Sequence, residues 1–296
     1  MRKWIARSAV ALTVLVSGAG AAFMVLAEMG DRKLARHVEV AVTPVAFRSD
    51  AVSVERGGYL FRSRGCGDCH GADGAGSVVI DDGAMHVRSP DITPAPNGVV
   101  ARYTPADWVR TIRHGVRPDG RPVMIMPSED YNRLVDADLA AIVAYVRQLP
   151  PASGAKAEMR LPMPLKALYA AGMLRDASEK IDHSLPPAQP VAEGVTAAHG
   201  AYVANSCLGC HGPRLAGGKI PGAPPDWPPA AKLTPGPGSA LDRYQTAEQF
   251  MAMLKTGKRP DGSSVSKVMP FTSLKEMNEV DVRALYLHLR SLPAGT

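Results

Sequence analysis

All four cysteines of this chain fall in two copies of one pentapeptide, Cys-x-x-Cys-His, at residues 66–70 and 207–211. Two thiols three positions apart can form thioether bonds to the two vinyl groups of a haem, while the histidine that follows can ligate its iron. The pattern therefore predicts two covalently bound c-type haems. The thioether residues would be Cys66, Cys69, Cys207 and Cys210, and the proximal iron ligands would be His70 and His211.

Other uses of paired cysteines fit the sequence less well. Zinc ribbons bring their second cysteine pair within roughly twenty residues of the first, whereas Cys69 and Cys207 lie far apart. A disulfide across each pair is open in an oxidising compartment, and a thioredoxin-like redox motif would need a βαβ pattern that the chain does not display. Neither use explains why a histidine follows both pairs.

The second axial ligand decides between an electron carrier and a catalyst, because an open iron position can bind peroxide, oxygen or another substrate. Met126 and Met269 occupy matching positions in the two halves, and each precedes a proline that fixes the local backbone. We therefore expect these two methionines to be the distal ligands and no residue to be catalytic. Met124 is the nearest rival, but Lys267 matches it in the second half. Less favoured candidates for the distal position are Met85, His86, Met251 and Met253.

The pentapeptides belong to a longer internal repeat. Residues 92–94 return at 233–235 as Ile/Leu-Thr-Pro, and Arg-Pro-Asp-Gly at 117–120 returns at 259–262. Arg102 and Arg243 also match, and are candidates for contacts to haem propionates, with a helix-cap or surface ion-pair role as the alternative. We expect two tandem haem domains, at residues 50–150 and 196–296, joined by a proline-rich linker at 151–195.

Each copy predicts three helices and no substantial sheet, which indicates an all-α fold. The first helix leads into the pentapeptide, at about 53–66 and 197–207, and the middle helix starts at Thr104 with a capping pattern. Apolar residues recur at i, i+3, i+4, i+7 and i+10 from Leu139 and from Val282, which predicts a third helix with one buried face. The first and third helices should cross and carry the haem, with glycines at positions 57–58 and 200 permitting close approach. Linker residues 165–174 predict a short helix docked on a domain, with disorder as the alternative.

Residues 8–27 carry no charge and are long enough to cross a bilayer as a helix. The basic residues before them should stay in the cytoplasm, so residues 1–28 are predicted to form a membrane anchor with the haem sites outside. Residues 25–27 loosely match a cleavage site, which leaves a removed signal peptide as the alternative. The formal charge is +6. Haem propionates would offset it, so nucleic acid is not expected as a partner.

Together, the pentapeptides, the Thr-Pro loops, residues 114–120, the Met-Pro pairs and the Leu-Pro endings resemble the class I cytochrome c fold. More narrowly, they resemble the membrane-bound cytochrome c subunits of bacterial periplasmic dehydrogenases for alcohol, aldehyde, gluconate and nicotinate-type substrates. Many of those subunits carry three haem domains, whereas this chain has two pentapeptides.

The resemblance implies a dihaem electron carrier on the inner membrane, facing the periplasm. Its partners would be the catalytic subunit of a periplasmic dehydrogenase as donor, and quinone, another cytochrome or a terminal oxidase as acceptor. The alternative is a catalytic dihaem protein, either a peroxidase or a thiosulfate-oxidising enzyme. A peroxidase needs one haem that can open, yet both copies keep the Met-Pro pair, and no cysteine is spare for the unusual ligand common in thiosulfate enzymes.

Overall fold

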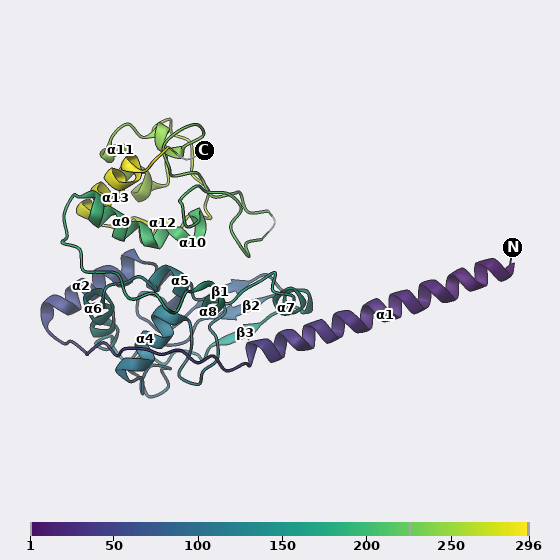
Figure 1. Cartoon of the computed structure of the whole chain (residues 1–296). Helices are drawn as coiled ribbons and strands as arrows, with labels where there is room; N and C mark the ends of the chain where they lie inside the picture. Colours follow the sequence, from purple (N-terminus) through teal and green to yellow (C-terminus); the bar gives the residue numbers. More distant parts are fainter. Residues whose placement is uncertain (1, 225, 295–296) are drawn as a thin grey trace.

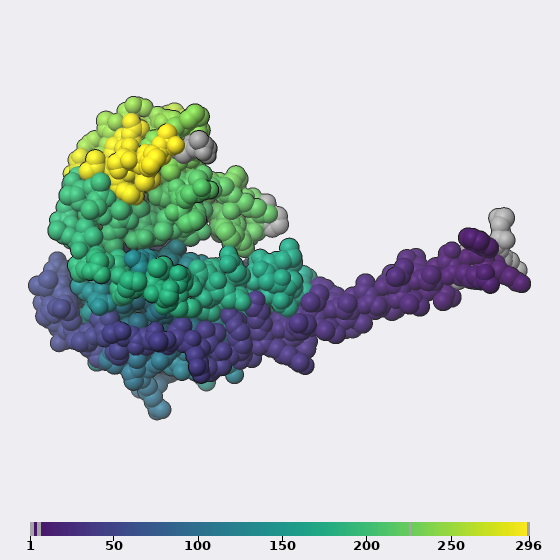
Figure 2. All heavy atoms as spheres, viewed as in Figure 1, coloured from purple at the N-terminus to yellow at the C-terminus, as the bar shows by residue number. Residues whose placement is uncertain are grey.

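A computed structural model describes residues 2–224 and 226–294, so Met1 and residues 295–296, the outer ends of the predicted anchor and of the predicted second domain, lie outside it. The described chain is mostly helical. A long N-terminal helix projects from two stacked helical lobes, which we call the first lobe (residues 50–150) and the second lobe (residues 196–294) (Figure 1). The atoms of the two lobes meet directly, and the outer part of the N-terminal helix projects away from both (Figure 2).

The first lobe is built on helices that its sequence caps locally. Asp50 accepts a hydrogen bond from the backbone of Ser53, and Thr104 forms the expected capping box with Asp107. The apolar faces of these helices enclose a core that includes Leu60 and Leu139. The helices are α2 (Ala51–Ser63), α3 (Cys66–His70), α4 (Pro105–His114), α5 (Ser128–Tyr131) and α6 (Asp136–Val146).

The second lobe repeats this arrangement around a core of its own, which includes Val203, Leu241 and Leu285. Thr246 and Asn278 cap its two longest helices. Its elements are α9 (Ala197–Ala204), η1 (Asn205–Cys207), α10 (Leu208–His211), η2 (Ala240–Arg243), α11 (Ala247–Thr256), α12 (Phe271–Leu274) and α13 (Glu279–Ser291). The three predicted long helices of each copy are therefore present.

The predicted helix crossing is confirmed in both lobes. Helix α2 crosses α6, and α9 crosses α13, each pair making the most extensive contact of its lobe. A Cβ on Gly57 would lie 1.9 Å from the carbonyl oxygen of Ala141, and one on Gly200 would lie 1.9 Å from that of Ala284. Only glycine fits at these positions, because any side chain would separate the crossing helices.

A small antiparallel sheet is a departure from the all-α expectation. Strands β1 (Val78–Asp81), β2 (His86–Arg88) and β3 (Glu158–Arg160) lie in the order β1-β2-β3. Strand β3 comes from the predicted linker, and all three of its residues are exposed. Its three residues are too few to show the alternation that predicts a strand, so the sequence carries no strand signal.

The linker is ordered rather than a flexible tether. It contains β3, helix α7 (Met163–Ala170) and helix α8 (Ala177–Lys180). Helix α7 starts two residues before the range expected for it, and it packs against the N-terminal helix α1 (Arg2–Leu34) rather than against a lobe (Figure 1). Residues 7–34 of α1 have a mean hydropathy of 2.2 in their most apolar window, so the helix is long and apolar enough to cross a membrane.

Candidate haem sites

Both pentapeptides lie at the end of the first helix of their lobe, beside the core. In the first lobe, Gly65 turns the chain with a φ of +81°, a conformation that favours glycine, and α3 follows at once. In the second lobe, the 3₁₀ turn η1 leads into α10. Cys66 packs against the first core, and Cys207 packs against the second. Each lobe therefore presents its first cysteine at the edge of an apolar interior, whereas Cys210 is exposed.

The two pentapeptide histidines are oriented in the same way. Nδ1 of His70 lies 3.1 Å from the carbonyl oxygen of Pro90, and Nδ1 of His211 lies 2.7 Å from that of Ala231. Because a carbonyl oxygen only accepts, each Nδ1 must carry the proton, which leaves Nε2 with its lone pair. The acceptors are the backbone carbonyls of Pro90 and Ala231. A ligating histidine is held in this way.

Burial lowers the pKa of His70 and of His211, although the bond to the carbonyl opposes the shift in each case. Both imidazoles are therefore neutral at neutral pH, which is the form that binds a metal. Burial also raises the pKa of the Cys66 thiol to about 12 and that of the Cys207 thiol to about 11. At these pKa values both thiols are protonated at neutral pH, which is their less reactive form.

In the second lobe, a cavity of about 310 Å³ brings the predicted ligands together. Cys207, His211 and Met269 all line it, and the rest of its wall is largely apolar. Thiol, imidazole nitrogen and thioether sulfur in one apolar cavity are the donor set of a His/Met c-type haem, so the residues fit the group. In the first lobe, Met126 and Cys66 pack against the same core.

The repeat-matched arginines behave differently in the two lobes. Arg243 lines the cavity of the second lobe, and so does Arg259 from the repeated Arg-Pro-Asp-Gly turn. Arg102 is exposed at the surface of the first lobe. A propionate contact therefore stays open for Arg243 and is not supported for Arg102.

Two tyrosines bridge the lobes in a reciprocal manner that the repeat did not lead us to predict. The hydroxyl of Tyr59 in the first lobe donates to Asp281 in the second at 2.6 Å, and that of Tyr202 in the second donates to Asp138 in the first at 2.7 Å. Each tyrosine and its counterpart are 143 positions apart, as are the two aspartates. The lobes are thus related by an approximate twofold axis. The sequence did hold a signal for this contact. Tyr59 matches Tyr202 and Asp138 matches Asp281 in the repeat, and these polar residues lie on helix faces that are otherwise apolar.

The buried charges at this interface break the symmetry. A guanidinium nitrogen of Arg64 lies 2.7 Å from Asp281, and the side chains of Arg64 and Asp281 are 5% and 0% exposed. Nε2 of His199 lies 2.7 Å from the other oxygen of the same carboxylate. Burial opposes ionisation of Asp281, but the Arg64 charge and the hydrogen bonds from Tyr59, Arg64 and His199 outweigh it and hold its pKa below the usual value. Asp138 pairs with Arg56 of its own lobe instead, at 3.0 Å.

Both pentapeptides also face the opposite lobe. A Cβ on Gly209, inside the second pentapeptide, would lie 2.6 Å from the carboxylate of Asp130 in α5. Ser273 in α12 is the repeat counterpart of Asp130, and α12 packs against α3, the helix that holds the first pentapeptide. Burial, followed by the charge of Glu129, raises the pKa of Asp130 to about 7. The two predicted haem sites therefore share one interface.

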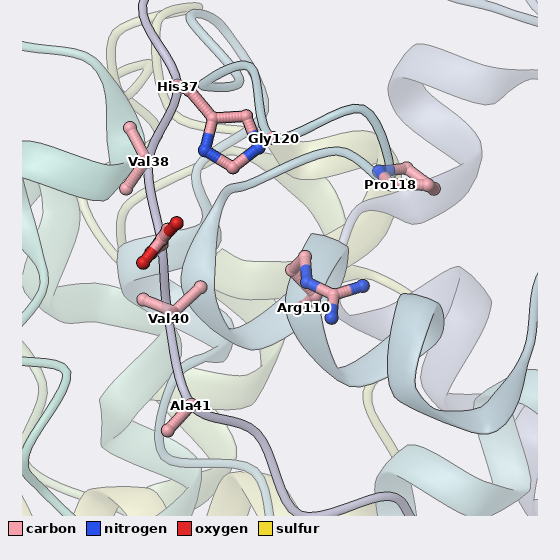
Figure 3. A pocket seen from close by; sticks show the side chains of 8 residues that line it. His37, Val38, Val40, Ala41, Arg110, Pro118 and Gly120 are labelled. Atoms are coloured by element: carbon pink, nitrogen blue, oxygen red, sulfur yellow. The ribbon is translucent and has the colours of Figure 1, made fainter.

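A larger hollow of about 430 Å³ lies away from these residues (Figure 3). It is lined by residues of α4, of the loop at Pro118–Gly120 and of the extended segment that follows α1. The backbone N–H of Val38 donates to the carbonyl of Gly120 at 2.8 Å, which ties this segment to the first lobe. Arg110 on its wall is already paired with Asp107 at 2.6 Å. None of the predicted thioether or iron ligands lines this hollow.

Comparison with known proteins agrees with the chemistry of the pentapeptides. Residues 52–146 match the family described as "Cytochrome C oxidase, cbb3-type, subunit III". The chain is 28% identical over 271 residues to the fructose dehydrogenase cytochrome subunit of Gluconobacter japonicus, covering 82% of this chain and 53% of that protein. It is also 28% identical over 272 residues to the cytochrome c subunit of alcohol dehydrogenase (quinone) of Gluconobacter oxydans, covering 83% and 56%.

The chain thus spans about half the length of these dehydrogenase subunits. A protein named "Diheme cytochrome c-type" from Cereibacter sphaeroides matches over nearly its whole length, at 25% identity over 308 residues, covering 93% of this chain and 97% of that protein. Residues 52–146 therefore match a cytochrome c family, and the chain resembles the cytochrome c subunits of bacterial dehydrogenases.

Proposed function

We propose that this chain is a membrane-anchored dihaem cytochrome c that carries electrons from a periplasmic dehydrogenase to quinone, another cytochrome or a terminal oxidase. The observation that carries the proposal is the matched orientation of His70 and His211, whose Nδ1 atoms both bond carbonyl oxygens and leave Nε2 for iron. Two tandem cytochrome c domains, at 50–150 and 196–296, would each hold one haem through these residues.

Haem iron, when bound, supplies a one-electron exchange between two oxidation states. The residues of the chain serve to hold that group still. Cys66, Cys69, Cys207 and Cys210 would tether it covalently, and the carbonyls of Pro90 and Ala231 fix the two imidazoles. Sulfur from Met126 and Met269 would be the second protein ligand of each iron, which would leave no position for a substrate. Fixed ligands and an apolar surround keep reorganisation on electron transfer small.

The shared interface suggests how two sites would act as one path. Each pentapeptide touches the short helix that follows the Met-Pro pair of the other lobe, at α5 and α12. An electron that enters one lobe would therefore have the second site as its nearest neighbour. The dehydrogenase donor is inferred from the relatives, which are cytochrome subunits of dehydrogenases, and the acceptors are inferred from the electron-transfer role.

The inner membrane location rests on α1. Ala27 is 5% exposed, and Gly30 one turn later is also buried, so helix and linker pack together on both sides of the candidate cleavage point. This packing favours an uncleaved anchor over a removed signal peptide. The lobes would then stand in the periplasm, where covalent haem attachment takes place.

The test is to produce the full chain in a bacterium that matures c-type cytochromes and to determine the mass of the purified protein. We expect the mass of two attached haems, a low-spin oxidised spectrum with the long-wavelength band of methionine-ligated iron, and no peroxide turnover. A mass with fewer than two haems would refute the dihaem proposal. A high-spin fraction that turns over peroxide would favour the catalytic alternative. Co-purification from native membranes then identifies the dehydrogenase.

A further inference from the structure

The end of α1 docks tightly on α7. Ala27 and Gly30 are three residues apart, so they lie on one face of the helix, and both are buried. A Cβ on Gly30 would lie 2.3 Å from the carbonyl oxygen of Lys166. The two helix backbones therefore touch at this point, and a larger residue at position 30 would force them apart.

Polar contacts fix the register of the two helices. Nζ of Lys166 lies 2.8 Å from the carboxylate of Asp31, and Nζ of Lys33 lies 3.0 Å from the carbonyl oxygen of Tyr169. Gly30 with Lys166 and Lys33 with Tyr169 are both pairs that lie 136 positions apart. Helix α7 therefore runs alongside α1 in the same direction, and this register places Met163 beside Ala27.

We call the contact between the end of α1 and α7 the joint. A buried acid, Asp176, lies next to it. Arg36 lies 2.7 Å from the carboxylate of Asp176, whose side chain is fully buried. The hydroxyl of Tyr169 donates to the same carboxylate, and Ser178 donates at 2.6 Å. Burial raises the pKa of Asp176, but the bonds from Ser178, Tyr169 and Arg36 outweigh it and hold the pKa below its usual value. The joint is thus a structured contact rather than a flexible hinge.

Met163 lies where the apolar part of α1 stops. Ala27 is the last residue of the uncharged stretch, and Glu28 is the first charge after it. Met163 begins α7 and is 45% exposed, although it is a large apolar side chain. The preceding β3 adds exposed Met159 and exposed Arg160 to the same stretch of chain. An apolar surface beside a basic residue suits the boundary between lipid tails and phosphate groups.

We propose that the segment from Met159 to Met163 rests in the outer interfacial layer of the membrane, and that the joint between α1 and α7 holds both lobes at a fixed orientation to the bilayer. The partner of this surface is lipid, because the surface adjoins the apolar helix at the point where that helix leaves the hydrocarbon. The inference rests on the proposed membrane anchor. It adds a second, peripheral contact and a fixed direction for the two haem sites.

The proposal is tested with single nitroxide labels in nanodiscs of phosphatidylethanolamine and phosphatidylglycerol. The full-length holoprotein is labelled at Met163→Cys, with the unsubstituted protein as the blank, since its native thiols would be in thioether bonds. Met173→Cys is the matched control, because Met173 is 73% exposed and lies beyond the opposite end of α7. Val16→Cys reports whether α1 itself lies in lipid.

We expect the label at 163 to relax faster with oxygen, which partitions into lipid, than with a water-soluble nickel chelate. The label at 173 should show the reverse. If the label at 163 behaves like that at 173 while the label at 16 is in lipid, the interfacial contact is refuted and the anchor stands. If the label at 16 is also in water, the anchor itself has failed.

A second variant tests the joint. Gly30→Leu should push α7 away from α1, so that the label at 163 becomes accessible to the nickel chelate while the label at 16 stays in lipid. The haem spectra should be unchanged, because position 30 is remote from both lobe cores. Continued lipid exposure at 163 in this variant would show that the joint does not set the orientation.

Discussion

The hydroxyl of Tyr59 meets the carboxylate of Asp281 across the contact between the lobes, 222 positions apart in the sequence. The same carboxylate also receives Arg64 from the first lobe and His199 from the second. A buried carboxylate is tolerable only when donors surround it in this way. The interface therefore contains a buried carboxylate, Asp281, whose hydrogen-bond donors come from both lobes.

Removal of this carboxylate should be costly. Asp281→Ala leaves the Arg64 guanidinium buried without its counter-charge, and we expect a loss of roughly 3–5 kcal/mol in the free energy of unfolding. Asp138→Ala is the matched control, because its partner Arg56 is 24% exposed and can turn to solvent. Urea unfolding followed by circular dichroism measures both. Equal losses in the two variants would contradict the role given to Arg64.

The helix crossing predicts a sharp difference between two neighbouring glycines. Gly57→Ala places a methyl group 1.9 Å from the Ala141 carbonyl oxygen, so α2 and α6 must separate. We expect a loss of about 1–3 kcal/mol or more, with reduced haem attachment in the first lobe. Gly58→Ala meets side chains alone, the Tyr145 ring at 3.0 Å and the Arg62 guanidinium at 3.4 Å, and alanine already stands at the matching position 201. Thermal unfolding should show the first variant markedly weaker, and similar midpoints would count against the crossing.

The proposed distal ligands, Met126 and Met269, give a spectroscopic prediction. Met126→Ala or Met269→Ala should remove the methionine band of one haem only, lower its reduction potential and admit carbon monoxide. Met124→Ala is the matched control, because Met124 lies two residues from the proposed ligand on the same loop. It should leave the spectrum unchanged, since Met124 is not the proposed ligand. Redox titration with optical detection separates the two haems. If Met126→Ala and Met269→Ala both leave the spectrum intact, the ligand assignment is wrong.

A histidine pair gives a pH prediction. Nδ1 of His114 lies 3.0 Å from Nδ1 of His183, and burial, followed by the charges of His183, Arg113 and Arg110, lowers the pKa of His114 to about 4. In the unfolded chain the same imidazole takes up its proton near the ordinary value of 6.5. The unfolded state therefore binds more protons between these values, so stability is full above pH 6.5 and falls as the pH drops toward 4.

Denaturant unfolding across this pH range measures the effect. In His114→Gln the fall should be shallower, because position 114 no longer titrates. An unchanged pH profile in His114→Gln would assign the acid sensitivity to other groups.

The features that the sequence predicted best depend on residues that lie close together in the chain. The pentapeptides, the Thr104 capping box and the apolar spacing of α6 and α13 are all local patterns, and each appears in the structure. Strand β3 escaped prediction because it pairs with a strand some seventy residues earlier and has no buried face. The bridge from Tyr59 to Asp281 escaped it because docking of the lobes, and not local sequence, decides which aspartate each tyrosine meets.

The reciprocal bridges also bear on how such modules can be recombined. A single lobe, produced by itself, would expose one tyrosine and one aspartate whose hydrogen-bond partners lie in the other lobe. Grafting either lobe onto an unrelated monohaem cytochrome would require the recipient to supply both the complementary hydroxyl and the complementary carboxylate. Designers who wish to transfer this fold to another protein should therefore move the two lobes as a pair.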